Sequence, residues 1–427
     1  MGCCRCNCMN KNEDNKNNND DKKEIILDLK KKNKDKDKCI LKFDTKDNNE
    51  IITDLEIESL LYKPNRLYNS AILIGLANIG ASIYMNPTLQ CLSNTDKLTN
   101  YFLNEFKCDK DDDTKKISYQ YYDLLQHLWN KFSEKKEYAP NNFQKLLSEI
   151  NPLFSGKNEV NSKDLLNYLL EMLHKELNKA PKEEQRKNID NINQNEEEIK
   201  QYFFKDFAEK NNSIISDLFY FVIETRSKCS ICNFIKINFQ ANSFLDFPLE
   251  QINKYLYNKG KIISLINNDG SNPDINLYDC FDYYPKMEII DKDNKIYCNA
   301  CNVYYDSNYS TILYSLPKIL VINLDRGKNE VYQCNVNFPE ELDLTNYIIN
   351  KEFNIKYELY GVICHIGPNP MSGYIVAYCR NRMDDKWYLY NDSNVTLWEK
   401  SCEYLNKMPY ILFYKSKNEN NITQNNN

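Results

Sequence analysis

The sequence predicts an α+β protein in which helices come first along the chain and strands follow. Three observations support this fold class. Segments in the first half of the apolar region repeat their apolar residues with helical spacing, later segments are rich in β-branched and aromatic residues, and turn residues separate those later segments. The chain has 427 residues, of which 42% are hydrophobic and 13% aromatic, so it can bury a large core.

Helical periodicity is clearest in residues 164–177, DLLNYLLEMLHKEL. Five leucines of this segment share one broad face, namely Leu165, Leu166, Leu169, Leu170 and Leu173. Residues 118–132 and 142–150 also predict helices. A further helix is expected to begin at Asn86, since Asn is a good N-cap and Pro87 suits the first helical position.

Strands are predicted in the second half of the chain. Five short segments there combine β-branched and aromatic residues. They are KILVINLDR (318–326), YELYGVICHIG (357–367), YIVAYCR (374–380), KWYLYND (386–392) and PYILFYK (409–415). Helices followed by strands are typical of an α+β architecture, and no internal repeat interrupts this order.

Composition divides the chain into three parts. Residues 1–67 are mostly polar, charged and rich in Asn, and we expect them to be largely disordered. A folded domain is expected over 68–415, with a mobile insertion at 178–200, where apolar periodicity is missing. Residues 416–427 are polar again and predict a disordered tail.

Charge and hydropathy exclude several classes of function. Lys and Arg total 55 against 61 Asp and Glu, a net charge of −6, so no basic excess indicates nucleic-acid binding. We see no run of about 18 apolar residues that could span a bilayer and no secretory signal peptide. We therefore expect a cytoplasmic protein, in which clusters among the 16 cysteines indicate metal or lipid rather than disulfides.

Two CxxC pairs predict a structural zinc (Zn) site. CSIC supplies Cys229 and Cys232, and CNAC supplies Cys298 and Cys301. Four thiolates complete a tetrahedral zinc shell and leave no open position for a substrate. Because the pairs are far apart in the chain, they must lie on different hairpins. Four unrelated buried cysteines are the alternative, and a redox pair is disfavoured because no thioredoxin-like pattern surrounds either CxxC.

The first residues, MGCCRCNC, predict lipid attachment. Gly2 is placed for myristoylation, and Cys3 and Cys4 are placed for palmitoylation. Two acyl chains hold a protein on a membrane surface, whereas one does so only marginally. Cys6 stands where a myristoylation signal prefers Ser or Thr. A metal-binding cysteine cluster and an unmodified tail are the alternatives.

Six stretches, taken in order over residues 68–415, resemble the catalytic domain of the ubiquitin-specific proteases. They begin with GLANIGASIYMNPTLQCLSN, LLNYLLEMLHKELN, SDLFYFVIETRSKCSICN, YCNAC and LPKILVINLDR, and end with YELYGVICHIGPNPMSGYIVAYCRN followed by KWYLYNDSNVT. The resemblance implies a papain-like cysteine-protease fold shaped as a hand, with fingers, palm and thumb and with zinc in the fingers. It also implies ubiquitin or ubiquitinated proteins as partners.

In that family a Cys thiolate attacks the isopeptide carbonyl, a His carries the proton, and an Asp or Asn orients the His. Matching the motifs residue by residue puts Ile83 at the nucleophile, Ala81 at the oxyanion-side Asn and Tyr374 at the general base. Only the orienting acid is kept, as Asp392. Ile83 has no lone pair, and a phenol is a poor base at neutral pH. The resemblance therefore implies a catalytically inactive domain, a pseudoenzyme.

Three functions are open at this point. The first is a non-catalytic module that binds ubiquitin or acts as a scaffold in deubiquitination. The second is an active deubiquitinating isopeptidase that uses Ser82 and His365 as substitute nucleophile and base. The third is an interaction domain that no longer binds ubiquitin. The remaining cysteines of these motifs, Cys91, Cys364 and Cys379, are expected in the core.

Overall fold

The computed structural model of the protein describes residues 71–417, except for 81–82, 111, 132, 156–159, 182–195, 287–295, 299, 306, 328–330, 349–354, 370–371 and 400–407. All of these residues lie within one of the two units of the chain, Tyr68–Asn427. The expected lipidation signal, and most of the expected insertion and tail, lie outside the described residues.

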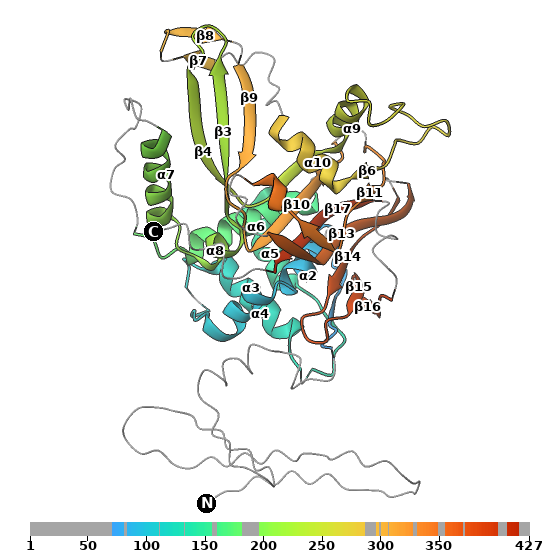
Figure 1. Ribbon diagram of the computed structural model, residues 1–427. Coiled ribbons are helices and arrows are strands. Elements are labelled where there is room, and N and C mark those ends of the chain that lie inside the picture. The colour runs from blue at the N-terminus through green and yellow to red at the C-terminus, as the bar shows by residue number, and fades with distance from the viewer. Residues whose placement is uncertain are drawn as a thin grey trace, which may run out of the picture. The chain divides into compact units, whose positions relative to one another are not determined.

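Helices dominate the first half of the described chain, as predicted (Figure 1). They are α2 (Met85–Ser93), α3 (Asp96–Asn100), α4 (Lys116–Leu128), α5 (Asn141–Ile150), α6 (Ser162–Leu177), α7 (Glu196–Lys210) and α8 (Ile214–Phe219). The three helices predicted from apolar spacing are confirmed as α4, α5 and α6. The five leucines of α6 are all buried, and each contributes about 1.5–3 kcal/mol relative to an exposed position. None of the described helices is both long and apolar enough to cross a membrane.

Helix α2 begins at Met85, one residue earlier than predicted, and the prediction that Asn86 is its N-cap is wrong. The N-cap position is held by Tyr84, and Pro87 is the third helical residue. Proline is tolerated there because the first four N–H groups of a helix have no partner within the helix. Asn86 does not cap because its side chain bonds to groups outside the helix, as described below.

A large sheet forms the second half of the domain. Its strands are β5 (Leu245–Pro248), β10 (Ile319–Asp325), β12 (Glu341–Asp343), β13 (Lys356–Asn369), β14 (Ser372–Arg380), β15 (Trp387–Asn391), β16 (Asn394–Leu397) and β17 (Pro409–Ser416). Their order is β16-β15-β14-β13-β17-β10-β5, and β12 pairs with β13 at its side. All five predicted strands are confirmed within this sheet.

Both faces of the sheet are buried, each in its own hydrophobic core. Along β10, Ile319 and Val321 join the core formed with the helices of the first half, whereas Leu320 and Ile322 join a second core. Two further helices, α9 (Leu249–Asn258) and α10 (Leu277–Tyr283), contribute to the second core. Burial on both sides explains why the strand segments read as nearly continuous apolar runs.

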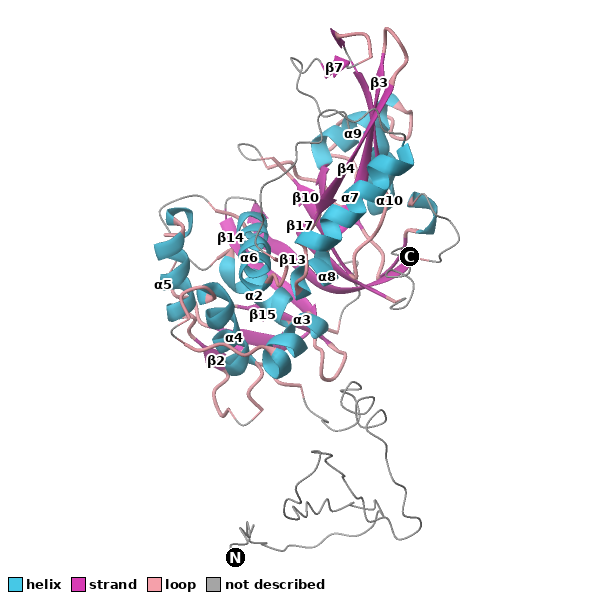
Figure 2. Cartoon of the chain, turned by 90° about the vertical axis from the view of Figure 1, so that its left-hand side faces the viewer, coloured by secondary structure: helices cyan, strands magenta, loops and turns pink. Residues whose placement is uncertain are grey.

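A separate three-stranded sheet projects from the large sheet and forms the fingers (Figures 1 and 2). It consists of β3 (Phe221–Cys229), β4 (Ile235–Asn242) and β9 (Ser307–Leu313), and a small hairpin of β7 (Ile296–Cys298) and β8 (Val303–Tyr305) lies at its far end. Two short parallel pairs complete the described strands, β1 (Gly75–Leu76) with β2 (Glu137–Tyr138), and β6 (Ile275–Asn276) with β11 (Val336–Asn337).

The mobile insertion predicted at 178–200 extends too far, because helix α7 begins inside that range. The last five residues of that range are helical, because α7 starts at Glu196. Its first turn holds three glutamates, which suit the positive end of a helix. The helix lies along the fingers, where the ring of Phe203 is 5.6 Å from that of Phe239 on β4 (Figure 2). None of its residues is fully buried, so the sequence carries no clear apolar period there.

Candidate functional site

The segment that precedes α2 is held in an extended form between two parts of the fold. The N–H of Gly75 donates to the carbonyl of Lys136 beside β2, at 2.8 Å, and the N–H of Leu76 donates to the carbonyl of Asp392, at 3.0 Å. Gly75 is required by close packing, because a Cβ there would lie 2.4 Å from the carbonyl oxygen of Ser393. The turn that contains Asp392 and Ser393 therefore lies directly against the start of the GLANIG motif.

Asp392 lies in the two-residue turn between β15 and β16, with a φ of +51°. One carboxylate oxygen accepts a hydrogen bond from the amide of Asn86, at 2.7 Å, and the other accepts from the amide of Asn78, at 3.0 Å. Asn86 is 2% exposed and also donates to the carbonyl of Leu76, while Asn78 accepts from the N–H of Gly80. The carboxylate therefore ties both ends of the motif to the sheet.

Sequence reasoning overlooked Asn78 and took Asn86 for the N-cap of α2. Asn78 and Asn86 both lie in the stretch GLANIGASIYMN, eight residues apart, and both are amide donors to one acid more than 300 residues later. The available signal was an Asn at each end of a glycine-containing turn. The amide of Asn86 is buried and needs a partner, whereas Asn78 is exposed.

The positions that the motif comparison matched to the nucleophile and the base both expose apolar or aromatic groups. Ile83 lies in a turn two residues before α2 and is 55% exposed. Tyr374 lies near the start of β14, is 63% exposed, and pairs across the sheet with Ile366. Among the described residues, no hydrogen bond joins Asp392 to Tyr374. Ala81 lies outside the described residues, next to Ser82.

His365 lies on the neighbouring strand β13, where it pairs with Ile375. Since side chains alternate between the faces of a strand, His365 and Tyr374 point to opposite faces of the sheet. Ile375 packs against the core to which α2 belongs, so His365 is on the face that α2 covers. Burial lowers the pKa of His365, which keeps the imidazole neutral at neutral pH.

The cysteines expected in the core are buried there. Cys91 on α2 and Cys379 on β14 are both fully buried, with their sulfur atoms 3.6 Å apart and no disulfide between them. Burial raises the pKa of Cys91 well above its usual value, and the neighbouring Cys379 adds to this effect. Burial likewise raises the pKa of Cys364 to about 12. Cys91 and Cys364 are therefore thiols at neutral pH and poor nucleophiles.

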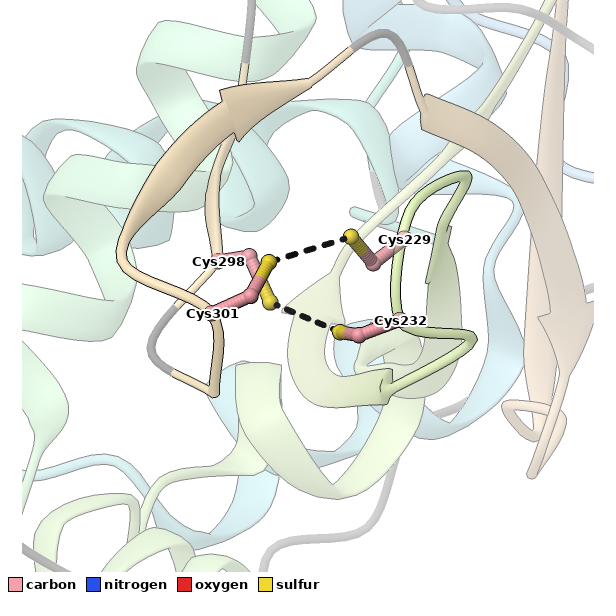
Figure 3. Close-up of side chains that lie close together, drawn as sticks. All are labelled: Cys229, Cys232, Cys298 and Cys301. Carbon is pink, nitrogen blue, oxygen red and sulfur yellow. Dashed lines mark hydrogen bonds between the residues drawn. The ribbon is translucent and has the colours of Figure 1, made fainter.

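The fold brings the two CxxC pairs together at the far end of the fingers. Cys229 ends β3 and Cys232 lies in the turn to β4, while Cys298 ends β7 and Cys301 lies in the turn to β8. All four sulfur atoms lie within 4.8 Å of one another (Figure 3). The closest pairs join the two hairpins, with 3.8 Å between Cys229 and Cys301 and 3.5 Å between Cys232 and Cys298.

Each pair sits in a turn of the same shape, which the sequence analysis did not single out. Asn233 and Asn302 follow the second cysteine of each pair, and both have a positive φ, of 60° and 56°. The N–H of Asn233 donates to the carbonyl of Cys229 at 3.0 Å, and that of Asn302 donates to the carbonyl of Cys298 at 2.8 Å. Asn tolerates this left-handed conformation better than most residues. The repeated pattern CxxCN was the signal for it.

The four thiols fit a divalent metal ion that prefers sulfur ligands. Although burial opposes ionisation of Cys298, hydrogen bonds from the backbone N–H groups of Cys301 and Ala300 lower the pKa of that thiol to about 7. Burial, together with the hydrogen bond to Cys298, raises the pKa of Cys301 to about 12. Several thiolates this close repel one another, and a cation among them removes that repulsion. Four sulfur ligands at mutual contact are typical of a structural zinc site.

Comparison with known proteins gives relatives over most of the chain. It is 28% identical over 355 residues to Ubiquitin carboxyl-terminal hydrolase 2 of Bos taurus, covering 80% of this chain and 55% of the relative. It is 26% identical over 386 residues to Ubiquitin carboxyl-terminal hydrolase 5 of Saccharomyces cerevisiae, covering 81% of this chain and 45% of the relative. The chain thus spans about half the length of these relatives.

Solved structures share the fold. The SAGA DUB module Ubp8/Sgf11/Sus1/Sgf73 bound to monoubiquitin matches 86% of this chain and 76% of its own, with a TM-score of 0.59 and 21% identity. The same module bound to ubiquitin aldehyde also gives a TM-score of 0.59, at 20% identity. The family described as ubiquitin carboxyl-terminal hydrolase matches residues 74–414. The chain therefore belongs to the ubiquitin carboxyl-terminal hydrolase family and has the fold of the ubiquitin-specific proteases.

Proposed function

We propose that this chain is a ubiquitin-specific-protease-like domain that binds ubiquitin and does not hydrolyse it. The observation that carries the proposal is the engagement of Asp392, whose two carboxylate oxygens accept hydrogen bonds from Asn78 and Asn86. The acid that would orient a general base instead holds the backbone segment before α2. The position matched to the nucleophile, Ile83, is an exposed hydrocarbon side chain.

Loss of activity follows from the chemistry that isopeptide cleavage requires. A thiolate forms the covalent intermediate, an imidazole accepts and returns its proton, and a polar group stabilises the oxyanion. Ile83 offers no nucleophile, Tyr374 is a phenol, and Ala81 has no side-chain donor. These functions depend on one another, so the loss of the nucleophile alone removes most of the rate enhancement.

Ubiquitin binding is supported by the parts of the fold that are kept. The large sheet, the helical half and the projecting fingers are all present, and the fold resembles a module whose solved structures hold ubiquitin. Binding does not require the catalytic groups, because affinity comes from contacts spread over a large surface. The cysteine cluster would hold a structural zinc ion that fixes the end of the fingers.

The N-terminal sequence supports a tether for this domain. We infer that the folded domain of residues 68–415 is joined by its polar N-terminal segment to acyl chains on Gly2, Cys3 and Cys4. A cytoplasmic protein would then be held at a membrane surface. Replacing Gly2 in Gly2→Ala should shift the chain from the membrane to the soluble fraction of cells. An unchanged distribution would refute the tether.

The decisive experiment pairs a binding measurement with an activity measurement on the full chain. We expect labelled ubiquitin to bind at micromolar concentration, and ubiquitin–rhodamine to be hydrolysed no faster than in buffer. The variant Ile83→Ser serves as a matched control, because it removes the exposed apolar side chain and should leave both results unchanged. Absence of ubiquitin binding would favour the third function, an interaction domain for another partner.

One observation favours the second function, an active isopeptidase that uses Ser82 and His365, enough to test it directly. His365 is a neutral imidazole on the face of the sheet that α2 covers, and α2 begins two residues after Ile83. If ubiquitin–rhodamine is hydrolysed, the variants His365→Gln and Ser82→Ala should each abolish turnover. Turnover that survives both changes would point to a contaminating protease.

A further inference from the structure

Six exposed apolar side chains surround the cysteine cluster at the far end of the fingers. This fingertip patch consists of Ile231, Phe234, Ile235, Tyr297, Val303 and Tyr304. Ile231 is 62% exposed and Tyr304 is 67% exposed, values typical of surface polar residues rather than of large apolar ones. Both hairpins contribute, since the first three residues lie at the β3–β4 turn and the last three on β7 and β8 (Figure 1).

The two CxxC turns hold these side chains outward. In each turn the cysteines converge on one another (Figure 3), while Ile231, Phe234 and Tyr297 beside them are exposed. The hydroxyl of Tyr297 donates to the side-chain oxygen of Asn302 at 3.2 Å, and the rings of Tyr297 and Tyr304 are 5.2 Å apart. The cysteine cluster therefore holds the patch in place. Its apolar side chains stay exposed and do not pack onto the β-strands.

Two exposed lysines lie on the β3–β4 side of the patch, while Asp291, Asp293 and Asp306 flank the β7–β8 hairpin in the sequence. Lys228 and Lys236 lie at the ends of β3 and β4 and are exposed, and within the described part of the chain neither has an ion-pair partner. Residues 229–236 and 297–304 hold no Asp or Glu. This differs from another exposed apolar stretch, around Ile263, where Lys261 is paired with both Asp279 and Asp282.

We infer that the fingertip patch docks on an anionic membrane surface. Ile, Phe and Tyr side chains flanked by Lys are the combination that enters the boundary between headgroups and acyl chains while the ammonium groups meet lipid phosphates. A stable protein–protein interface needs about 20–30 residues on each side, and six side chains at the free end of a hairpin pair are far fewer. A bilayer requires only that a few apolar groups enter it.

This contact is independent of the proposed ubiquitin binding and of any acyl chain. It complements the N-terminal signal MGCC, because one weak membrane attachment becomes stable when a second is added. The fingertip would then also set how the domain is oriented on the surface, with the fingers pointing into the headgroups.

The test is vesicle co-sedimentation with the full, unacylated chain produced in bacteria. Vesicles of phosphatidylcholine with about 30% phosphatidylserine are compared with phosphatidylcholine alone. Two double variants probe the patch, Phe234→Ser/Tyr304→Ser and Lys228→Glu/Lys236→Glu. The matched control is Ile263→Ser/Ile266→Ser, which removes two exposed apolar groups elsewhere. Bound zinc is measured in every variant to show that the fingers remain folded.

We expect the parent chain to bind the anionic vesicles and to release as salt is raised, because screening weakens the contact of both lysines. Each patch variant should reduce the partition coefficient about tenfold, while the control stays within about twofold of the parent. Equal binding to neutral and anionic vesicles, or equal losses in the patch and control variants, would overturn the inference.

Discussion

The carboxylate of Asp392 is the single group on which the shape of the segment before α2 depends most. It bonds to Asn86, which is almost fully buried, and to Asn78, which in turn receives the N–H of Gly80. Hydrogen bonds to a charged acceptor are stronger than neutral ones, and a buried amide left without its acceptor keeps its full desolvation cost. The side chain that the motif comparison matched to the family's orienting acid thus holds the segment before α2.

Replacing this acid in Asp392→Ala should lower the free energy of unfolding by about 1–3 kcal/mol, because the amide of Asn86 loses its charged acceptor. Urea denaturation measures the change. The control Asp113→Ala removes a carboxylate that is 85% exposed and paired with Lys116, and it should cost less than about 0.5 kcal/mol. Equal losses in the two variants would show that Asp392 does not organise the segment.

At the scale of secondary-structure elements, helix α4 shows how one element stabilises another. Its first turn has no side-chain cap of its own. The carboxylate of Glu176, near the end of α6, instead accepts the N–H of Ile117 at 3.1 Å and that of Ser118 at 2.7 Å. A negative group at a helix N-terminus is also favoured by the helix dipole. The sequence near α4 therefore gives no sign of how the helix begins.

Truncating that carboxylate in Glu176→Ala should destabilise the domain by about 1–2 kcal/mol, as loss of an N-cap does. Thermal or urea unfolding measures this effect. Glu171→Ala is the matched control, since Glu171 lies on the same helix with its side chain exposed. A control variant that is as unstable as Glu176→Ala would mean that the loss reflects helix charge rather than the cap.

The finger hairpins are the second case at the element scale, because the cysteine cluster is the core that β7 and β8 share with β3. We expect about one zinc ion per chain by metal analysis, lost in Cys232→Ser. A strong chelator should increase proteolysis within the fingers before it affects the large sheet. Cys108→Ser, which changes a thiol outside the cluster, should keep both the metal and the resistance to proteolysis. A metal-free parent chain with resistant fingers would refute the zinc site.

At the scale of the whole molecule, the large sheet joins two hydrophobic cores into one folded unit. Alternate residues of the same strands point into each core. A change in packing on one face of the sheet therefore affects packing on the other face. Two of the three histidines are involved in this packing. His174 contacts the hydroxyl of Ser213, the N-cap of α8, at 2.7 Å, and His365 lies on β13.

Acid should lower the free energy of unfolding of this folded unit at the pH where histidine ionises. Burial lowers the pKa of both His174 and His365 below 6.5, so the unfolded chain binds protons more readily than the folded one. The free energy of unfolding should be level above about pH 7.5 and fall as pH drops below 6.5. In His174→Gln/His365→Gln this fall should be shallower, measured by urea midpoints across the range. An unchanged slope in the double variant would contradict the assignment.

The features that could be predicted from the sequence were those with a local sequence pattern. Leucines at helical spacing identified α6, β-branched runs identified the strands, and the paired cysteines identified the cysteine cluster. These signals are visible because periodicity and ligand spacing follow directly from helix, strand and turn geometry. The start of α2 was predicted wrongly, because a local capping rule took Asn86 as a cap when a distant acid had already engaged its side chain.

The sequence by itself determined the fold class, the two cysteine pairs and the absence of a thiol at residue 83. Only the tertiary structure decided what the neighbouring polar groups do. It placed Asp392 against Asn78 and Asn86, Glu176 at the start of α4, and two distant hairpins around one cluster. The physical reason is that hydrogen bonds and metal ligands act over a few ångströms in space, whatever their separation along the chain.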